Sequence, residues 1–159
     1  MSISMASDQQ VVIFRLAEGS YAIDIAAVRE IIRPQPITAV PHAPQHIVGV
    51  INLRSAVVPI LDLRQRCGLP PAAETRDTRI VVAQADAQSV GLIVDAVSEV
   101  TTIPAGVVEP VEGVVRGESA QRLLRGVARL EERLVLLLDL TQVIASPSGD
   151  VAPTAATAA

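Results

Sequence analysis

An internal duplication constrains the fold of this chain more than any other feature of its sequence. Segments 49–63 (GVINLRSAVVPILDL) and 126–140 (GVARLEERLVLLLDL) align without a gap at an offset of 77, and seven of fifteen positions are identical. A weaker match at an offset of 69 places 22–31 (AIDIAAVREI) over 91–100 (GLIVDAVSEV). The same order of blocks in both halves indicates a repeated structural unit. We therefore expect Leu61 and Leu138 to be equivalent core residues.

Each half contains a set of short apolar segments that favour β-strands. The core must be built from Val, Ile, Leu and Ala, and branched side chains pack well on a pleated sheet. Strands are expected at 10–16, 20–25, 37–40, 46–53 and 56–61 in the first half, and at 79–83, 89–94, 97–103, 123–130 and 133–138 in the second. Residues 26–32 could instead form a short helix, because apolar residues recur there with a helical period.

The predicted fold class is therefore all-β with short helices. Five short strands in each half suggest two small barrels, pseudo-repeats of one another, that close their exposed edges. The expected organisation is a flexible N-terminus (1–9), a first barrel half (10–69), a linker (70–78), a second barrel half (79–145) and a disordered tail (146–159) rich in Ala, Pro, Ser and Thr.

Charge and aromatic content argue against a nucleic-acid partner. The formal net charge is −4, and the thirteen basic residues are all arginines scattered along the chain. The only aromatic residues are Phe14 and Tyr21. Single-stranded nucleic-acid binding needs stacking aromatics and a basic groove, so this chain lacks both requirements.

A cytoplasmic location without membrane insertion is the expectation. Cys67 is the single cysteine, so no intrachain disulfide can form, which suits a reducing compartment. The first ten residues lack the basic and apolar segments of a signal peptide. The longest apolar run, 134–138, is far shorter than the ~20 residues that span a bilayer.

Asp62 and Asp139 are the carboxylates that recur at the end of an apolar strand in both halves. Paired carboxylates from two β-rich halves could share a proton, as in aspartic proteases. That chemistry needs a small hydroxyl residue and Gly beside each Asp, and here Leu63 and Leu140 follow. We expect each Asp to cap the short helix after it.

The remaining candidates for chemistry predict no cofactor, metal or catalytic residue. His42 and His46 have a spacing that can bind a metal on a helix, but Pro41 and Pro44 disfavour a helix there. Cys67 has no motif or evident base, so a packed, inert thiol is expected. A non-catalytic protein is the resulting interpretation.

Several stretches form an ordered series of motifs along the chain. In order they are Val28-x-Glu30-Ile31, Val40-Pro41, Gly49 to Arg54 (GVINLR) and Val58 to Arg64 (VPILDLR), followed by Gly91 to Val97 (GLIVDxV), Gly126 to Ala128 (GVA) and Leu137 to Asp139 (LLD). Together these motifs resemble the CheW family of bacterial chemotaxis coupling proteins. The resemblance covers about residues 10–145. It implies two five-stranded SH3-like barrels and an adaptor that binds chemoreceptor cytoplasmic tips and the regulatory domain of the histidine kinase CheA.

The resemblance also implies a partner-binding set. Its members are Val28, Glu30, Ile31, Gly49 and Arg54. A short apolar edge with a flanking Glu and a protruding Arg suits an amphipathic helical hairpin. Arg54 lies at an expected hairpin tip, where a guanidinium has little to pack against in its own chain and can form a fork to a partner's carboxylate.

One residue departs from the family pattern. The family usually has Gly after this Arg, whereas this chain has Ser55, which is strained if the turn needs a positive φ. Four members of the set also have purely structural interpretations: Glu30 as a solvated charge, Gly49 as a strand bulge, and Val28 and Ile31 as core residues.

The alternative functions are an adaptor of a related pathway, such as twitching motility or surface sensing, and a small Asp-dependent hydrolase.

Overall fold

A computed structural model describes residues 8–43, 46–85, 87–111 and 118–145 of the chain. The expected tail, most of the expected flexible N-terminus and part of the loop before residue 118 lie outside these residues. The strands are β1 (Gln9–Leu16), β2 (Gly19–Asp24), β3 (Val28–Ile32), β4 (Ile47–Leu53), β5 (Ala56–Asp62), β6 (Arg79–Ala85), β7 (Gln88–Val94), β8 (Ala96–Ile103), β9 (Val108–Glu109), β10 (Leu124–Leu130) and β11 (Arg133–Leu138). The helices are η1 (Ile25–Ala27), α1 (Leu63–Arg66), α2 (Glu118–Leu123) and α3 (Leu140–Ile144).

The segment between η1 and β4 differs from the prediction. Residues 28–32 form strand β3, after a single 3₁₀ turn capped by the side chain of Asp24. The strand expected at 37–40 is wrong, because only an isolated bridge joins Thr38 to Val50. Pro36 and Pro41 bracket this segment, and proline has no backbone N–H to donate to a sheet ladder.

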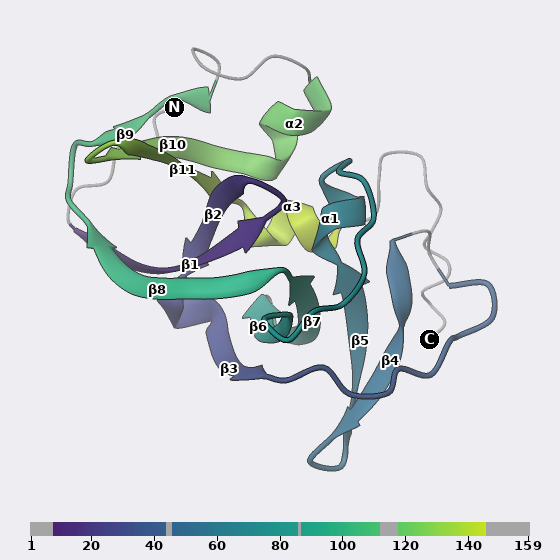
Figure 1. Cartoon of the computed structure of the whole chain (residues 1–159). Coiled ribbons are helices and arrows are strands. Elements are labelled where there is room, and N and C mark those ends of the chain that lie inside the picture. Colours follow the sequence, from purple (N-terminus) through teal and green to yellow (C-terminus); the bar gives the residue numbers. More distant parts are fainter. Residues whose placement is uncertain (1–7, 44–45, 86, 112–117, 146–159) are drawn as a thin grey trace.

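The strands form two sheets that exchange strands between the halves of the sequence (Figure 1). One sheet has the order β8-β1-β2-β11-β10-β9, and the other has the order β3-β6-β7-β5-β4. The all-β fold class is confirmed. The expectation that 10–69 and 79–145 would each build one barrel is wrong for strand pairing, because β1 and β2 join the later strands while β6 and β7 join the earlier ones.

The exchange is reciprocal, which confirms the duplication. If β1, β2, β3, β4 and β5 are matched to β6, β7, β8, β10 and β11, the five-stranded order of one sheet reproduces that of the other. The parallel ladders have the same register, since Ile60 pairs with Gly91 as Leu137 pairs with Ala22. Bulges also recur in the same places, at 47–49 and at 124–126.

Three apolar layers hold the molecule together. One cluster is formed by side chains of the β8–β10 sheet, and a second by side chains of the β3–β4 sheet. The third cluster, here called the central layer, contains Phe14 and Leu92 and draws its residues from both sheets. Leu61 and Leu138 both lie in this central layer, with relative exposures of 0% and 1%. Their equivalence, expected from the repeat, is confirmed.

Candidate functional site

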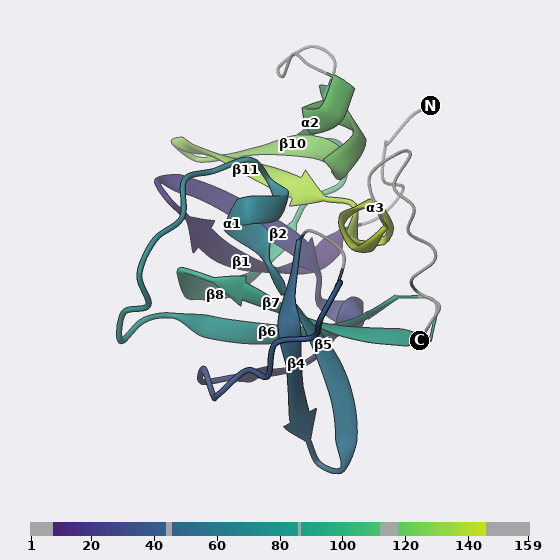
Figure 2. The ribbon, with the colours of Figure 1, turned by 90° about the vertical axis from the view of Figure 1, so that its right-hand side faces the viewer.

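The predicted site centres on edge strand β3 and the tip of the β4–β5 hairpin, which projects from the body of the molecule (Figure 2). Nη2 of Arg54 at the tip lies 2.9 Å from Oε1 of Glu30 on β3. The Arg54 side chain is 76% exposed and that of Glu30 is 28% exposed. Arg54 thus packs little against its own chain, as expected, but it forms an ion pair with Glu30, the other predicted charged residue, which the sequence did not predict.

The hairpin turn fixes the direction of Arg54. Arg54 and Ser55 have φ values of 52° and 73°. Two consecutive left-handed residues are typical of a type I′ turn, whose twist matches that of the flanking strands. Ser55 thus occupies a left-handed position that favours glycine, and the turn is formed with a side chain that is strained there.

The other predicted residues divide between surface and interior. Ile31 is 40% exposed. Val28 is partly buried against the central layer. Gly49 is buried, and a Cβ atom there would lie 2.3 Å from the carbonyl oxygen of Thr38. The absence of a side chain at Gly49 therefore lets segment 37–38 cross β4, so any effect of Gly49 on a partner must act through the backbone.

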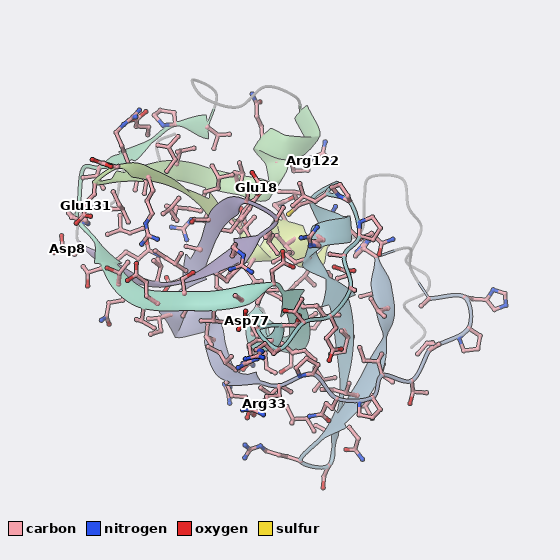
Figure 3. The ribbon with its side chains drawn as sticks, viewed as in Figure 1. Asp8, Glu18, Arg33, Asp77, Arg122 and Glu131 are labelled. Atoms are coloured by element: carbon pink, nitrogen blue, oxygen red, sulfur yellow. The ribbon has the colours of Figure 1, made fainter. Side chains whose placement is uncertain are left out.

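The second half contains a related ion pair that sequence reasoning missed. Glu99 on β8, the repeat equivalent of Glu30, pairs with Arg133 at the start of β11. The equivalent of Arg54 is Glu131, which marks the other hairpin tip in Figure 3. The cation is thus supplied from a position two residues later in the hairpin, a displacement that an ungapped repeat alignment does not reveal.

An ion pair at the junction of the halves was also missed. Arg64 on α1 donates from Nε and Nη2 to Asp95, between β7 and β8, with Nη2–Oδ2 at 2.6 Å. The same carboxylate accepts the Ala17 N–H at 2.7 Å, and Nη1 of Arg64 donates to the Pro70 carbonyl. The hydrogen bond from Arg64 lowers the pKa of Asp95. This network joins α1, the β1–β2 turn, the linker and β7.

Both repeated aspartates cap helices. Asp62 accepts the Arg64 N–H at 3.1 Å, and Asp139 accepts the Gln142 N–H at 3.3 Å. Each precedes a short helix, α1 or α3, and has extended backbone dihedrals typical of an N-cap. The structural interpretation of Asp62 and Asp139 is confirmed.

The residues considered for metal or thiol chemistry are dispersed. His46 is 5% exposed, whereas His42 lies on an exposed loop with a φ of 60°. Within the described ranges, no group of three His, Cys, Asp or Glu residues is arranged to hold a metal ion. Burial raises the pKa of Cys67 to about 11, so this residue is a protonated thiol at neutral pH. No helix in the described part of the chain is long and apolar enough to cross a membrane.

Comparisons with known proteins agree with this architecture. The model of the CheW-like domain matches residues 10–148. The chain is 35% identical over 145 residues to a probable chemotaxis protein CheW of Rhizobium etli, covering 91% of this chain and 93% of that protein. It is 37% identical over 144 residues to the chemotaxis protein CheW of Rhizobium meliloti, covering 91% and 92%.

The fold matches a solved structure with similar coverage. The scaffolding protein TtCheW of Thermoanaerobacter tengcongensis superimposes with a TM-score of 0.79 and 33% sequence identity, over 87% of this chain and 89% of that one. The fold and the sequence similarity thus indicate the same family. The chain belongs to the CheW-like domain family, and it is a scaffold of bacterial chemotaxis signalling.

Proposed function

We propose that this protein couples the cytoplasmic tips of chemoreceptors to the regulatory domain of the histidine kinase CheA, without catalysing a reaction. The observation that carries this proposal is the Glu30–Arg54 ion pair, which places a protruding guanidinium beside exposed apolar side chains. The coupling takes place in the cytoplasm, where both partner segments lie.

The ion pair can be exchanged for contacts with a partner at low cost. An exposed pair of this kind contributes only about 0–1 kcal/mol, because water solvates both charges when it opens. Arg54 can therefore turn toward a partner's carboxylate and leave Glu30 free for a partner's cation. A charge-assisted fork on the partner adds geometric selectivity.

Apolar side chains around the pair provide the contact area. Ile31 on β3 is 40% exposed and Val57 on β5 is 70% exposed. Val100 on β8, the repeat equivalent of Ile31, is 50% exposed. Val28 and Val97 both pack against the central layer between the sheets. Ile31 and Val57 thus offer apolar surface on the sheet that carries the ion pair, which suits the apolar face of a helical hairpin, and Val100 lies at the equivalent position of the other sheet.

The test is co-sedimentation of the purified protein with receptor-bearing membranes, with and without CheA, beside a panel of hydrolase substrates. We expect the protein to pellet with the membranes and to increase the amount of CheA that pellets. Failure to bind either partner, or turnover that disappears in Asp62→Asn, would overturn the proposal. Binding only to components of a twitching-motility or surface-sensing system would favour the adaptor of a related pathway.

A further inference from the structure

A hollow of about 160 Å³ lies beneath the linker between the two halves of the sequence. Its walls come from the β3–β4 connection, the ends of β5, β6 and β7, and linker residues 72–74. None of the five predicted partner-binding residues lines it. Its volume is below the ~300–1,000 Å³ typical of sites for whole small-molecule ligands, so it suits a single side chain.

One side of the hollow is apolar. Ile80, which is 1% exposed, belongs to the cluster of the β3–β4 sheet. Ile37 and Ile93 are partly buried and pack against the same cluster. All three line the hollow, and they offer a surface on which an alkyl stem can lie.

The polar side of the hollow has an excess of negative charge. Asp62, Glu74 and Asp95 line it together with one cation, Arg64. Arg64 is engaged, because its guanidinium binds Asp95 and the Pro70 carbonyl. Oδ1 of Asp62 accepts the Arg64 backbone N–H, while within the described residues no side-chain cation pairs with Asp62 or Glu74. Arg64 also interacts electrostatically with Asp62, and Glu74 is exposed. Three carboxylates against one guanidinium leave the lining with a net charge of −2 next to an apolar surface.

We propose that this hollow binds an arginine side chain of a partner protein, at a site separate from the Glu30–Arg54 surface. The alkyl stem packs against Ile37, Ile80 and Ile93, and the guanidinium pairs with Asp62 and Glu74. A planar guanidinium matches a carboxylate through two parallel hydrogen bonds, and it loses hydration more easily than an ammonium group.

The experiment is a titration with N-propylguanidine, monitored through the backbone amide NMR signals of the full chain. The neutral isostere N-propylurea serves as the ligand control. We expect saturable shifts at Ile37, Thr78, Ile80 and Ile93 with the guanidine alone. Asp62→Asn with Glu74→Gln should weaken binding about tenfold or more, because the charged acceptors are lost.

Matched variants keep the outcome interpretable. Asparagine can still cap α1, so the double variant should retain its fold, and its own amide spectrum checks this. Asp139→Asn makes the same change at the equivalent cap outside the hollow and should leave binding unaltered. Equal responses to guanidine and urea, shifts confined to the β4–β5 hairpin, or undiminished affinity in a folded double variant would each overturn the proposal.

Discussion

The β4–β5 and β10–β11 hairpins occupy equivalent places in the two sheets, yet their tips differ in charge. The first tip is Arg54-Ser55, and the second is Glu131-Glu132. Both arms are alike where they face the core, with the same bulge and the same parallel pairing to β7 or β2. The two halves therefore have equivalent strand pairing in the sheets and different residues at the exposed tips of the hairpins.

The ion pairs show what this difference means physically. Glu30 and Glu99 are equivalent, but one pairs with the hairpin tip and the other with the first residue of β11. Arg54 is 76% exposed and Arg133 is 43% exposed, so only the first half presents a guanidinium at the end of a projecting hairpin. A shared core is thus compatible with two different surfaces, and four predictions test this comparison.

The largest effect is expected in the shared core. Leu61→Ala and Leu138→Ala should each lower the free energy of unfolding by about 2–5 kcal/mol, because each leaves a cavity in the central layer. Urea denaturation followed by circular dichroism measures both values. Val57→Ala, at a 70% exposed position of β5, is the control and should stay within about 0.5 kcal/mol of the unmodified protein. If Leu61→Ala or Leu138→Ala lowered the free energy of unfolding by less than Val57→Ala does, the two leucines would not be equivalent core residues.

The next effect concerns the junction, where the halves are not alike. Asp95→Asn should destabilise the protein by about 1–2 kcal/mol, since Arg64 and the Ala17 N–H lose a charged acceptor that is partly exposed. The pKa of Asp95 is lowered in the folded state, so its contribution is present above its unfolded pKa of about 3.9 and is lost as the pH falls through the folded pKa.

Urea denaturation of Asp95→Asn at a series of pH values between neutrality and acid checks this sign. The difference from the unmodified protein should be largest near neutrality and should shrink in acid. Glu109→Gln, which removes the more exposed ion pair with Arg129, is the control and should have little effect. A difference that grows as the pH falls is the opposite of what we expect.

A smaller and opposite effect is expected at the first hairpin tip. Ser55→Gly should stabilise the protein by about 0.4–1 kcal/mol, because glycine adopts the φ of 73° without the steric conflict of a side chain. Ala56→Gly, at the first residue of β5, should instead destabilise it, since Ala56 has no positive φ and glycine loses more conformational freedom on folding. Thermal melting of both variants gives the comparison, and a destabilised Ser55→Gly would mean that the Ser55 side chain makes a contact the turn requires.

The sequence predicted what depends on local pattern. Alternating apolar runs, the Asp62 and Asp139 caps and the repeat offset located the strands and the equivalent core leucines. The sequence did not predict which strands pair with each other. Because the two halves are repeats, β1–β2 and β6–β7 are equally compatible with either set of remaining strands. Reciprocal exchange is therefore decided by tertiary packing, as in the central layer around Phe14 and Leu92.

The candidate site was predicted only in part for a related reason. The motif Val-x-Glu-Ile and the hairpin Arg were found, but their mutual ion pair joins residues 24 positions apart. Arg64 and Asp95 are 31 positions apart and come from opposite halves. Such pairs depend on how the exchanged strands bring distant segments together. Arg64 and Asp95 both lay within the family-like stretches, which was the one signal that could have identified them.

We propose that the projecting Arg54 serves partner binding and that the equivalent pair at Arg133 does not. Arg54→Ala should change the melting temperature little, because the exposed pair with Glu30 contributes about 0–1 kcal/mol to folding. Binding isotherms with the receptor tip and with the regulatory domain of CheA should show a loss of about 1–3 kcal/mol for Arg54→Ala. Arg54→Lys should recover only part of this loss. Arg133→Ala should bind both partners normally. Unchanged affinity for both partners in Arg54→Ala, or an equal loss in Arg133→Ala, would show that Arg54 has no binding role of its own.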